Sequence, residues 1–286
     1  MALEFAKMHG LGNDFVVFDA VRQDVALTPE RIRALADRRF GVGCDQVLVV
    51  APPEREGVDF TYRIYNADGG EVEQCGNGAR CVAAFARAAG LSDKDELRVE
   101  TLGGPLTLAL ADDEQVAVDM GAPRLAGAEI PLAEAGEWIR RPLEAAGVQW
   151  PVTAVSMGNP HAVIEVADAE SAPVEGVGAE LEQHPLFPNR ANVGFVQVLG
   201  PDRLRVRVWE RGAGVTLACG TGACAAMVAA RLWGKVAETA EVRLDGGSLR
   251  IHWPGRGQPV TMTGPAELVY WGRLPDWPAP RPASAR

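Results

Sequence analysis

Two copies of one short motif, each with a single cysteine before a glycine-rich turn, are the residues best suited to do chemistry. The first copy is Cys75-Gly76-Asn77-Gly78-Ala79 and the second is Cys219-Gly220-Thr221-Gly222-Ala223, and an alanine-rich stretch follows both. A turn of this kind that opens a helix presents backbone N–H groups without helical partners, and such groups bind anions. A cysteine at this position should have a lowered pKa, because helix N-termini favour the thiolate.

Two such devices around one substrate would suit the inversion of a carbon atom next to a carboxylate. One thiolate would remove a proton from one face of the carbon, and the other thiol would deliver a proton to the opposite face. The two helix N-termini would stabilise the charge that develops on the carboxylate, and such stabilisation usually dominates catalysis. A thiol with a pKa near ~8.5 is only slightly ionised at neutral pH, so the pair must be tuned and would titrate as a coupled unit.

The repeat extends upstream of both cysteines in the same order and at a nearly constant spacing. A duplicated fold would place one thiol in each half, so we predict an N-terminal domain over 1–120 and a C-terminal domain over 121–274. The last strand either stays with the second domain or returns to the first, and the Pro/Ala/Arg-rich stretch 275–286 is predicted to be a disordered tail. The matched upstream pairs are Gly12-Asn13 with Gly158-Asn159, Gln46 with Asn192, and Tyr62–Tyr65 with Val206–Trp209.

Polar residues around the motifs are candidates for a binding pocket. The Glu210-Arg211 pair follows a strand at the mouth of the second motif, and His161 follows a Gly-Asn-Pro turn. A solvated surface pair and a packed loop residue are the alternatives, but arginine suits bidentate binding of a carboxylate. Amides at strand ends often only stabilise turns, yet their pairing between the halves favours a shared polar pocket. These amides are Asn13, Gln46, Asn66, Asn159 and Asn192.

Strands dominate the elements that must position these residues, because many apolar runs are short and several alternate with polar residues. The predicted strands are 15–18, 47–50, 60–65, 106–110, 116–120, 162–166, 193–199, 204–209, 242–244, 249–253, 260–263 and 268–271. The predicted helices are 30–39 with Thr28 as N-cap, and 77–89 and 221–232, which end at Gly90 and Gly234. The last two are apolar nearly all round, so they should be buried. Each half is therefore a curved sheet wrapped around a central helix, and residues 121–151 form the connection.

Length and composition restrict the class of protein. A chain of 286 residues is long enough for its core to split into two domains, and 47% hydrophobic with 23% charged residues is typical of a soluble protein. A net charge of −10 argues against nonspecific binding to nucleic acid or an anionic membrane. There is no long apolar run and no charged-then-apolar leader, so we expect a cytoplasmic protein. Five cysteines are too few, and odd in number, for a secreted disulfide framework.

We predict a mechanism without a cofactor or a metal. Pyridoxal phosphate usually acidifies an amino-acid Cα, but no lysine lies in a recognisable phosphate-binding context. Zinc is disfavoured because five or four residues, rather than two, separate the first cysteine of each motif from the next, and only 4 histidines exist. The cysteines without a counterpart in the other half are expected to be inert buried hydrophobes. They are Cys44, Cys81 and Cys224.

With both motifs in this order, the chain closely resembles the diaminopimelate epimerase family. Residues 66–81, from Asn66 through Cys75 to Cys81, are similar to the first signature of that family, and residues 210–224 are similar to the second. Gly10–Phe15 and Gly158–His161 match as well, and the similarity covers nearly the whole chain. One departure is Val215, where an acidic residue is frequent, and it affects only local packing of the loop.

The resemblance implies a homodimeric isomerase with two similar β-barrel-like domains and an active site in the cleft between them. It implies interconversion of LL- and meso-diaminopimelate, in lysine and cell-wall synthesis, without cofactor or metal. Cys75 and Cys219 would be the acid/base pair, with His161 and Glu210 as supporting residues. The backbone at Gly76-Asn77 and Gly220-Thr221 would bind the reacting carboxylate, with Asn13 and Gln46 nearby. The distal end of the substrate would be bound by Arg211, Asn66, Asn159 and Asn192. Tyr270 would make a dimer contact.

Three other functions remain open at this point. Another two-cysteine racemase, such as one acting on proline, would have little need for Arg211 and several amides at a distal end. A thiol–disulfide oxidoreductase would fit two thiols, but the chain has no Cys-x-x-Cys. A noncatalytic amino-acid-binding protein is disfavoured because both cysteines are present.

Overall fold

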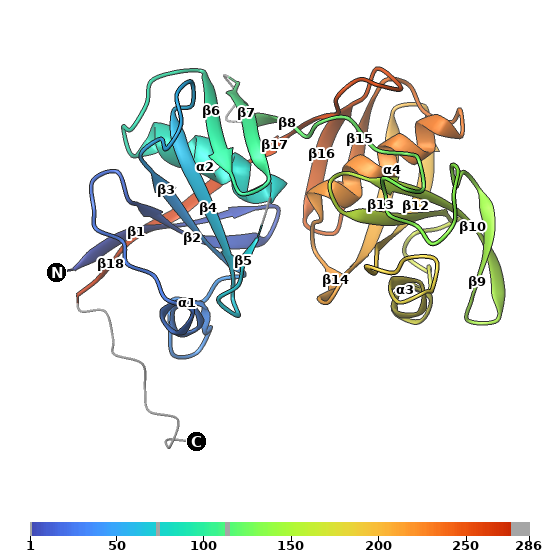
Figure 1. The fold of residues 1–286 in the computed structure, drawn as a ribbon, viewed down its shortest axis with the longest axis horizontal. Helices are drawn as coiled ribbons and strands as arrows, with labels where there is room; N and C mark the ends of the chain where they lie inside the picture. The colour runs from blue at the N-terminus through green and yellow to red at the C-terminus, as the bar shows by residue number, and fades with distance from the viewer. Residues whose placement is uncertain (1, 73–74, 112–114, 276–286) are drawn as a thin grey trace. The chain divides into compact units, whose positions relative to one another are not determined.

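The computed structural model describes residues 2–72, 75–111 and 115–275 (Figure 1). The chain forms two compact units: unit 1 comprises Met1–Val118 and Pro265–Arg286, and unit 2 comprises Asp119–Gly264. Each unit combines a mixed sheet with helices, which confirms the predicted mixed α+β class. The predicted tail comprises residues 275–286, and all of it after Pro275 lies outside the described residues.

Unit 1 is a mixed sheet in the strand order β18-β1-β2-β3-β4-β6-β7-β8, and the short β5 pairs with β4. The β2–β3 and β4–β6 pairs are parallel, and the others are antiparallel. The strands are β1 (Leu3–Gly10), β2 (Asn13–Asp19), β3 (Gln46–Ala51), β4 (Phe60–Asn66), β5 (Glu71–Val72), β6 (Glu96–Thr101), β7 (Gly104–Leu110), β8 (Gln115–Asp119) and β18 (Glu267–Leu274).

Unit 2 repeats this order strand by strand, as β9-β10-β11-β12-β13-β15-β16-β17, with the short β14 paired to β13. Its parallel pairs, β11–β12 and β13–β15, correspond to those of unit 1. One difference is that β1 pairs with the last strand of the chain, whereas β10 pairs with the strand that precedes it. The strands are β9 (Arg141–Ala145), β10 (Val148–Ser156), β11 (Pro160–Glu165), β12 (Asn192–Gly200), β13 (Arg203–Glu210), β14 (Gly214–Thr216), β15 (Thr239–Leu244), β16 (Gly247–His252) and β17 (Thr261–Pro265).

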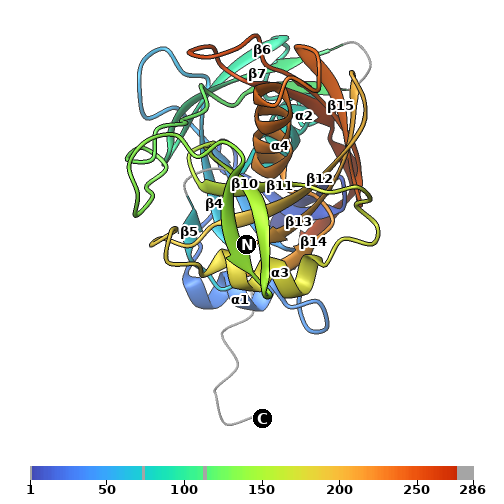
Figure 2. The ribbon, with the colours of Figure 1, turned by 90° about the vertical axis from the view of Figure 1, so that its right-hand side faces the viewer.

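The helix that follows each cysteine is central to its unit, as predicted. Helix α2 (Gly76–Ala88) contacts β1, β2, β3, β7 and β18, and nearly all of its residues are buried. Helix α4 (Gly220–Leu232) is buried in the same way against β10–β13, β15 and β16 (Figure 2). Because these helices are covered by strands, their apolar composition on every face matches their surroundings.

Two shorter helices occupy corresponding places between equivalent strands, α1 (Pro29–Ala36) between β2 and β3, and α3 (Val174–Glu182) between β11 and β12. Thr28 caps α1 by accepting a hydrogen bond from the Arg31 N–H at 3.3 Å. The helix ends before residue 39, because the Asp37 carboxylate accepts the Arg39 and Phe40 N–H groups and holds a turn instead.

Every predicted strand falls within a strand of the structure, apart from single end residues, but the prediction for residues 121–151 is wrong. They are not a bare connection, because β9 lies there and Ile130, Trp138 and Leu143 are buried in the core of unit 2. Helix α3 and several strands, including β1, β6 and β10, are also absent from the prediction. Charged residues interrupt the apolar residues of β1 and β6, and a proline lies within β10. No helix in the described ranges is long and apolar enough to cross a membrane.

The N-cap of α1 leads to a stability prediction. Thr28→Ala removes an acceptor for a first-turn N–H, so the free energy of unfolding should fall by about 1 kcal/mol. Urea denaturation of both proteins measures this difference. Thr28→Ser keeps the hydroxyl and should remain near wild type, and an equal loss in both variants would contradict the capping role.

Candidate functional site

Each motif cysteine is the N-cap of the central helix in its unit. The Cys75 sulfur accepts a hydrogen bond from the Gly78 N–H at 3.4 Å, and the Cys219 sulfur accepts one from the Gly222 N–H at 3.4 Å. A side chain at Gly78 would overlap the Tyr62 hydroxyl, so this position needs glycine. Both sulfurs therefore lie at a helix N-terminus, as the spacing predicted.

Around Cys75, the structure brings together two amides from the predicted set. The Asn13 amide donates to Asp45 Oδ2 at 3.0 Å, so its carbonyl oxygen is the group that lies 3.8 Å from the Cys75 sulfur. The same oxygen accepts a hydrogen bond from Asn77 Nδ2 at 3.2 Å. The buried Arg80 guanidinium donates to Asn77 Oδ1 at 3.0 Å and thereby sets the direction of the Asn77 amide.

Gln46 and Asn66 lie at the same end of the sheet of unit 1. They are paired across β3 and β4, and Gln46 Nε2 donates to Asn66 Oδ1 at 2.8 Å. Gln46 also pairs in register with Phe15, close to Asn13 in β2. Gln46 Oε1 is buried and has no hydrogen-bond partner among the described residues.

Around Cys219, three predicted residues form one connected group. The Cys219 sulfur lies 3.6 Å from the Thr221 hydroxyl, which accepts a hydrogen bond from Asn159 Nδ2 at 3.3 Å. The Asn159 carbonyl oxygen lies 3.0 Å from His161 Nε2. This arrangement resembles that of unit 1, with Asn159 in the place of Asn13 and Thr221 in the place of Asn77.

Glu210 and Arg211 follow at the end of β13. The Glu210 carboxylate accepts a hydrogen bond from the Thr216 hydroxyl. The Arg211 N–H donates to Asn192 Oδ1 at 2.9 Å, and Arg211 Nη1 donates to the Asn189 carbonyl at 3.0 Å. Asn192 is therefore used to hold the main chain at Arg211.

Register makes the difference between the two thiol environments explicit. His161 pairs with Asn192 just as Phe15 pairs with Gln46, so a histidine replaces a phenylalanine. Glu210 ends β13 where Asn66 ends β4, so a carboxylate replaces an amide. Only the unit 2 thiol therefore has an ionisable carboxylate and an imidazole at these equivalent positions.

For Cys219, the predicted lowering of the thiol pKa is wrong. Burial raises the pKa of Cys219 well above its usual value, and the nearby Glu210 carboxylate raises it further. The hydrogen bonds from Thr221 and the Gly222 N–H act in the opposite direction but do not outweigh burial. Burial, with the charge of Arg211, also lowers the pKa of His161 to about 3, so this imidazole is neutral at pH 7.

The remaining cysteines are buried, as predicted for inert residues: Cys44, Cys81 and Cys224. Burial raises the pKa of Cys44 to about 11 and that of Cys81 to about 12. In the described ranges, no group of three or more His, Cys, Asp or Glu side chains is arranged to hold a metal ion. Each lysine is in an ion pair, Lys7 with Asp14, Lys94 with Asp59 and Lys235 with Glu165.

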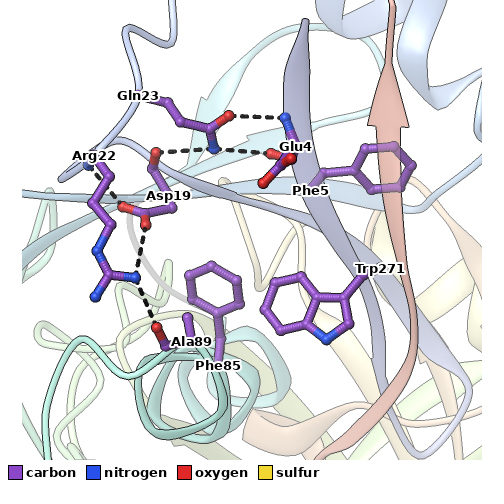
Figure 3. Close-up of a pocket in the computed structure, with 8 residues that line it drawn as sticks. All are labelled: Glu4, Phe5, Asp19, Arg22, Gln23, Phe85, Ala89 and Trp271. Carbon is purple, nitrogen blue, oxygen red and sulfur yellow. Dashed lines mark hydrogen bonds and ion pairs between the residues drawn. The ribbon is translucent and has the colours of Figure 1, made fainter.

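A pocket of ≈ 300 Å³ in unit 1 has none of the predicted site residues in its lining (Figure 3). Phe85 and Trp271 form part of its wall, and the Arg22 guanidinium donates to the carbonyls of Ala89 and Gly90 at 2.8 Å. Arg22 therefore caps the C-terminal end of α2, opposite Cys75. Tyr270, the predicted dimer contact, is 45% exposed on β18.

Two residues that support the site were missed. Asp45 orients the Asn13 amide, and Tyr62 packs beneath the first turn of α2 with its buried hydroxyl unpartnered among the described residues. Asp45 directly precedes the matched Gln46, and Tyr62 opens the matched strand segment, so position beside the repeat was the available signal.

The duplicated fold defines the class of protein structurally, because solved structures of epimerases and racemases share it. Solved structures with the same fold include a hydroxyproline epimerase from Agrobacterium vitis, with TM-score 0.69, 16% identity and coverage of 96% of this chain and 92% of that one. A predicted epimerase from Pseudomonas aeruginosa has TM-score 0.67, 17% identity and coverage of 96% and 99%. At this level of identity the likeness concerns the fold alone.

The chain belongs to the diaminopimelate epimerase family, as the motifs predicted. The family model named diaminopimelate epimerase matches residues 5–126 and 153–269. A diaminopimelate epimerase from Azoarcus sp. strain BH72 is 58% identical over 275 residues, covering 96% of this chain and 99% of the relative. Those from Aromatoleum aromaticum and Thioalkalivibrio sulfidiphilus are 57% and 54% identical, with the same coverage.

The environment of Cys219 leads to a prediction about its reactivity. Glu210→Gln removes a negative charge that raises the pKa of the Cys219 thiol, so the pKa of Cys219 should fall. Alkylation by iodoacetamide, followed at each cysteine by mass spectrometry across neutral and alkaline pH, should then reach its half-maximal rate at lower pH. The exposed Glu129→Gln serves as control, and an unchanged or higher Cys219 profile in Glu210→Gln would contradict this account.

The support of Asn13 leads to a prediction about acid stability. Asp14 is bonded to Arg38, which also binds the Asn13 partner Asp45. Burial raises the pKa of Asp14, but the bonds and charges of Arg38 and Lys7 outweigh burial and bring the pKa to about 2. A lowered pKa contributes stability above the unfolded value near 3.8 that is lost as pH falls toward 2.

Asp14→Asn should therefore reduce the free energy of unfolding at pH 7 by about 2 kcal/mol, and the difference from wild type should shrink as the pH falls through this range. Urea denaturation at several pH values measures it, with the exposed Asp24→Asn as control. A difference that stays constant with pH would show that the Asp14 charge is not the cause.

Proposed function

We propose that this protein interconverts LL- and meso-2,6-diaminopimelate, with Cys75 and Cys219 as the two acid/base groups. The observation that carries the proposal is the placement of each thiol as the N-cap of an equivalent central helix. One thiolate removes the Cα proton, the other thiol delivers its own proton to the opposite face, and the thiol and thiolate roles are then exchanged. The first-turn N–H groups around Gly76-Asn77 and Gly220-Thr221 stabilise the charge on the reacting carboxylate.

In one direction of the proposed reaction, Cys219 starts as the protonated thiol. Burial and the Glu210 carboxylate favour the protonated thiol, so Cys219 begins as a proton donor. For Cys219 to act as base, Glu210 is the carboxylate placed to receive the thiol proton. His161 is neutral and is bonded to Asn159, so it supports the position of this amide.

The substrate needs recognition at both ends. Arg211 suits the distal carboxylate through its planar donors. The amides Asn66, Asn159 and Asn192 lie at or directly beside strand ends. The buried Gln46 Oε1 supports a role in accepting a hydrogen bond from a substrate ammonium. A pocket for proline would need no cation at a distal end, so Arg211 disfavours that rival.

We also propose a homodimer in the cytoplasm. Exposed apolar side chains on the edge strand β18, including Val269, Tyr270 and Trp271, support a contact between two copies. Synthesis of lysine and of cell-wall precursors would place the enzyme in the cytoplasm.

Incubation of the reduced protein with LL-diaminopimelate in D₂O tests the reaction. Wild type should incorporate deuterium at Cα together with inversion, measured by NMR and chiral chromatography. Cys75→Ala and Cys219→Ala should each lower turnover by about 10³-fold, the scale of a lost acid or base. Exchange with proline but not diaminopimelate would move the protein to the rival racemase class, and thiol-dependent disulfide reduction without any exchange would reject an isomerase.

A further inference from the structure

Glu182, the last residue of α3, is a buried carboxylate that the reaction itself does not use. Its side chain accepts the Trp209 indole N–H at Oε2, 2.7 Å away, and the Gly212 main-chain N–H at Oε1, 3.0 Å away. Arg190 Nη1 lies 3.5 Å from Oε1. The Glu182 side chain is nearly inaccessible to solvent, at 6% exposure, so its two shorter contacts, with Trp209 and Gly212, are shielded from water.

The two principal donors flank Glu210 and Arg211 in the sequence. The carboxylate therefore holds the Trp209 side chain before these two proposed substrate and thiol contacts and the Gly212 main chain after them. The Glu182 carbonyl also accepts the Ala191 N–H at 3.1 Å, directly before Asn192. One helix end thus ties together the two segments that meet in the Arg211–Asn192 hydrogen bond.

Close packing of α3 against Trp209 reinforces this attachment. Gly178 lies one turn before Glu182 on the same helix face. A Cβ at Gly178 would lie 2.7 Å from the Trp209 Cβ, so only glycine allows this approach. The Trp209 side chain is consequently held by Gly178 along the helix and by Glu182 at its indole nitrogen.

Only a carboxylate satisfies both donors. Each Glu182 oxygen faces an N–H group, and ionised glutamate accepts at both oxygens. A glutamine of the same shape would present one amide donor to an N–H donor, so one of the two contacts would be lost and the loop would shift.

Unit 1 uses the equivalent helix in a related way. Arg33 of α1 donates to the Asp68 carbonyl at 2.8 Å, in the loop that begins at Asn66. Gly69 of that loop has φ 93° and approaches Pro29 at the start of α1, where a Cβ would lie 2.7 Å from the Pro29 Cα. Both helices therefore hold the loop that follows the strand ending in a proposed site residue.

We propose that Glu182 is a positioning residue that aligns Arg211 with the distal carboxylate of the substrate and Glu210 with Cys219. This inference rests on the proposed function for the identity of the substrate, but the Glu210–Cys219 alignment can be measured without turnover.

Glu182→Gln is the direct test, with Glu175→Gln in the first turn of the same helix as the matched control. Steady-state kinetics with LL-diaminopimelate should show KM raised by about tenfold, with a smaller change in kcat, because binding of the distal end is weakened. The pH at which iodoacetamide alkylates Cys219 at half its maximal rate should fall, because Glu210 moves away from the thiol. Glu175→Gln should leave both measurements at their wild-type values.

The outcomes separate the two proposals. The positioning role would be overturned if Glu182→Gln left the pH profile of Cys219 alkylation unchanged and lowered kcat and kcat/KM by the same factor. Glu182 would then have only a general structural role. A shifted Cys219 profile in a protein whose wild type does not act on diaminopimelate would uphold the positioning role and reject the proposed function. If Glu182→Gln does not fold, Trp209→Phe removes one of the two donors and should move both measurements in the same direction to a smaller extent, and no change would overturn the proposal.

Discussion

The structure depends on the need to satisfy the N-terminal N–H groups of two buried helices. A helix wrapped by a sheet cannot turn its first N–H groups toward bulk water, and unpaired buried donors are costly. In both units a cysteine sulfur accepts the N–H group at the third helical position. The residue that completes each helix is thus also the thiol that the repeated motif carries. The same helix turn is closely packed at both glycines: a Cβ would lie 2.4 Å from the Tyr62 hydroxyl at Gly78 and 3.2 Å from the capping Cys219 sulfur at Gly222.

Duplication produces two units with equivalent backbones, and a few residue differences make the two units chemically different. The strand order, the two parallel pairs and the helix positions recur in both units. In unit 2 the Glu210 carboxylate and the His161 imidazole occupy the positions of the Asn66 amide and the Phe15 ring of unit 1, and Glu210 acts directly on the Cys219 thiol. Thiols at equivalent backbone positions can therefore have different surroundings, and their protonation depends on those neighbours rather than on topology.

Much of this arrangement could be predicted from residue order. The alternating runs identified the strands, the Thr-Pro start identified α1, and the matched cysteines identified both central helices. Residues 121–151 were mistaken for a connection because their buried residues are widely separated in sequence and come together only in the core of unit 2. Helix α3 was missed because it has weak capping, with Pro173 as an N-cap that makes no side-chain hydrogen bond.

The sequence by itself determined the duplicated plan, the two thiols at helix N-termini and membership of the family, because these follow from local spacing and repeated order. Tertiary structure decided the protonation tendency of Cys219, the direction of the Asn13 amide and the attachment of the Arg211 loop to Glu182. Each of these depends on burial or on partners far apart in the chain: Asp45 lies well beyond Asn13, and Glu182 lies well before Trp209. A helix N-terminus alone favours a thiolate, but burial beside a carboxylate outweighs it, and only the folded chain sets that balance.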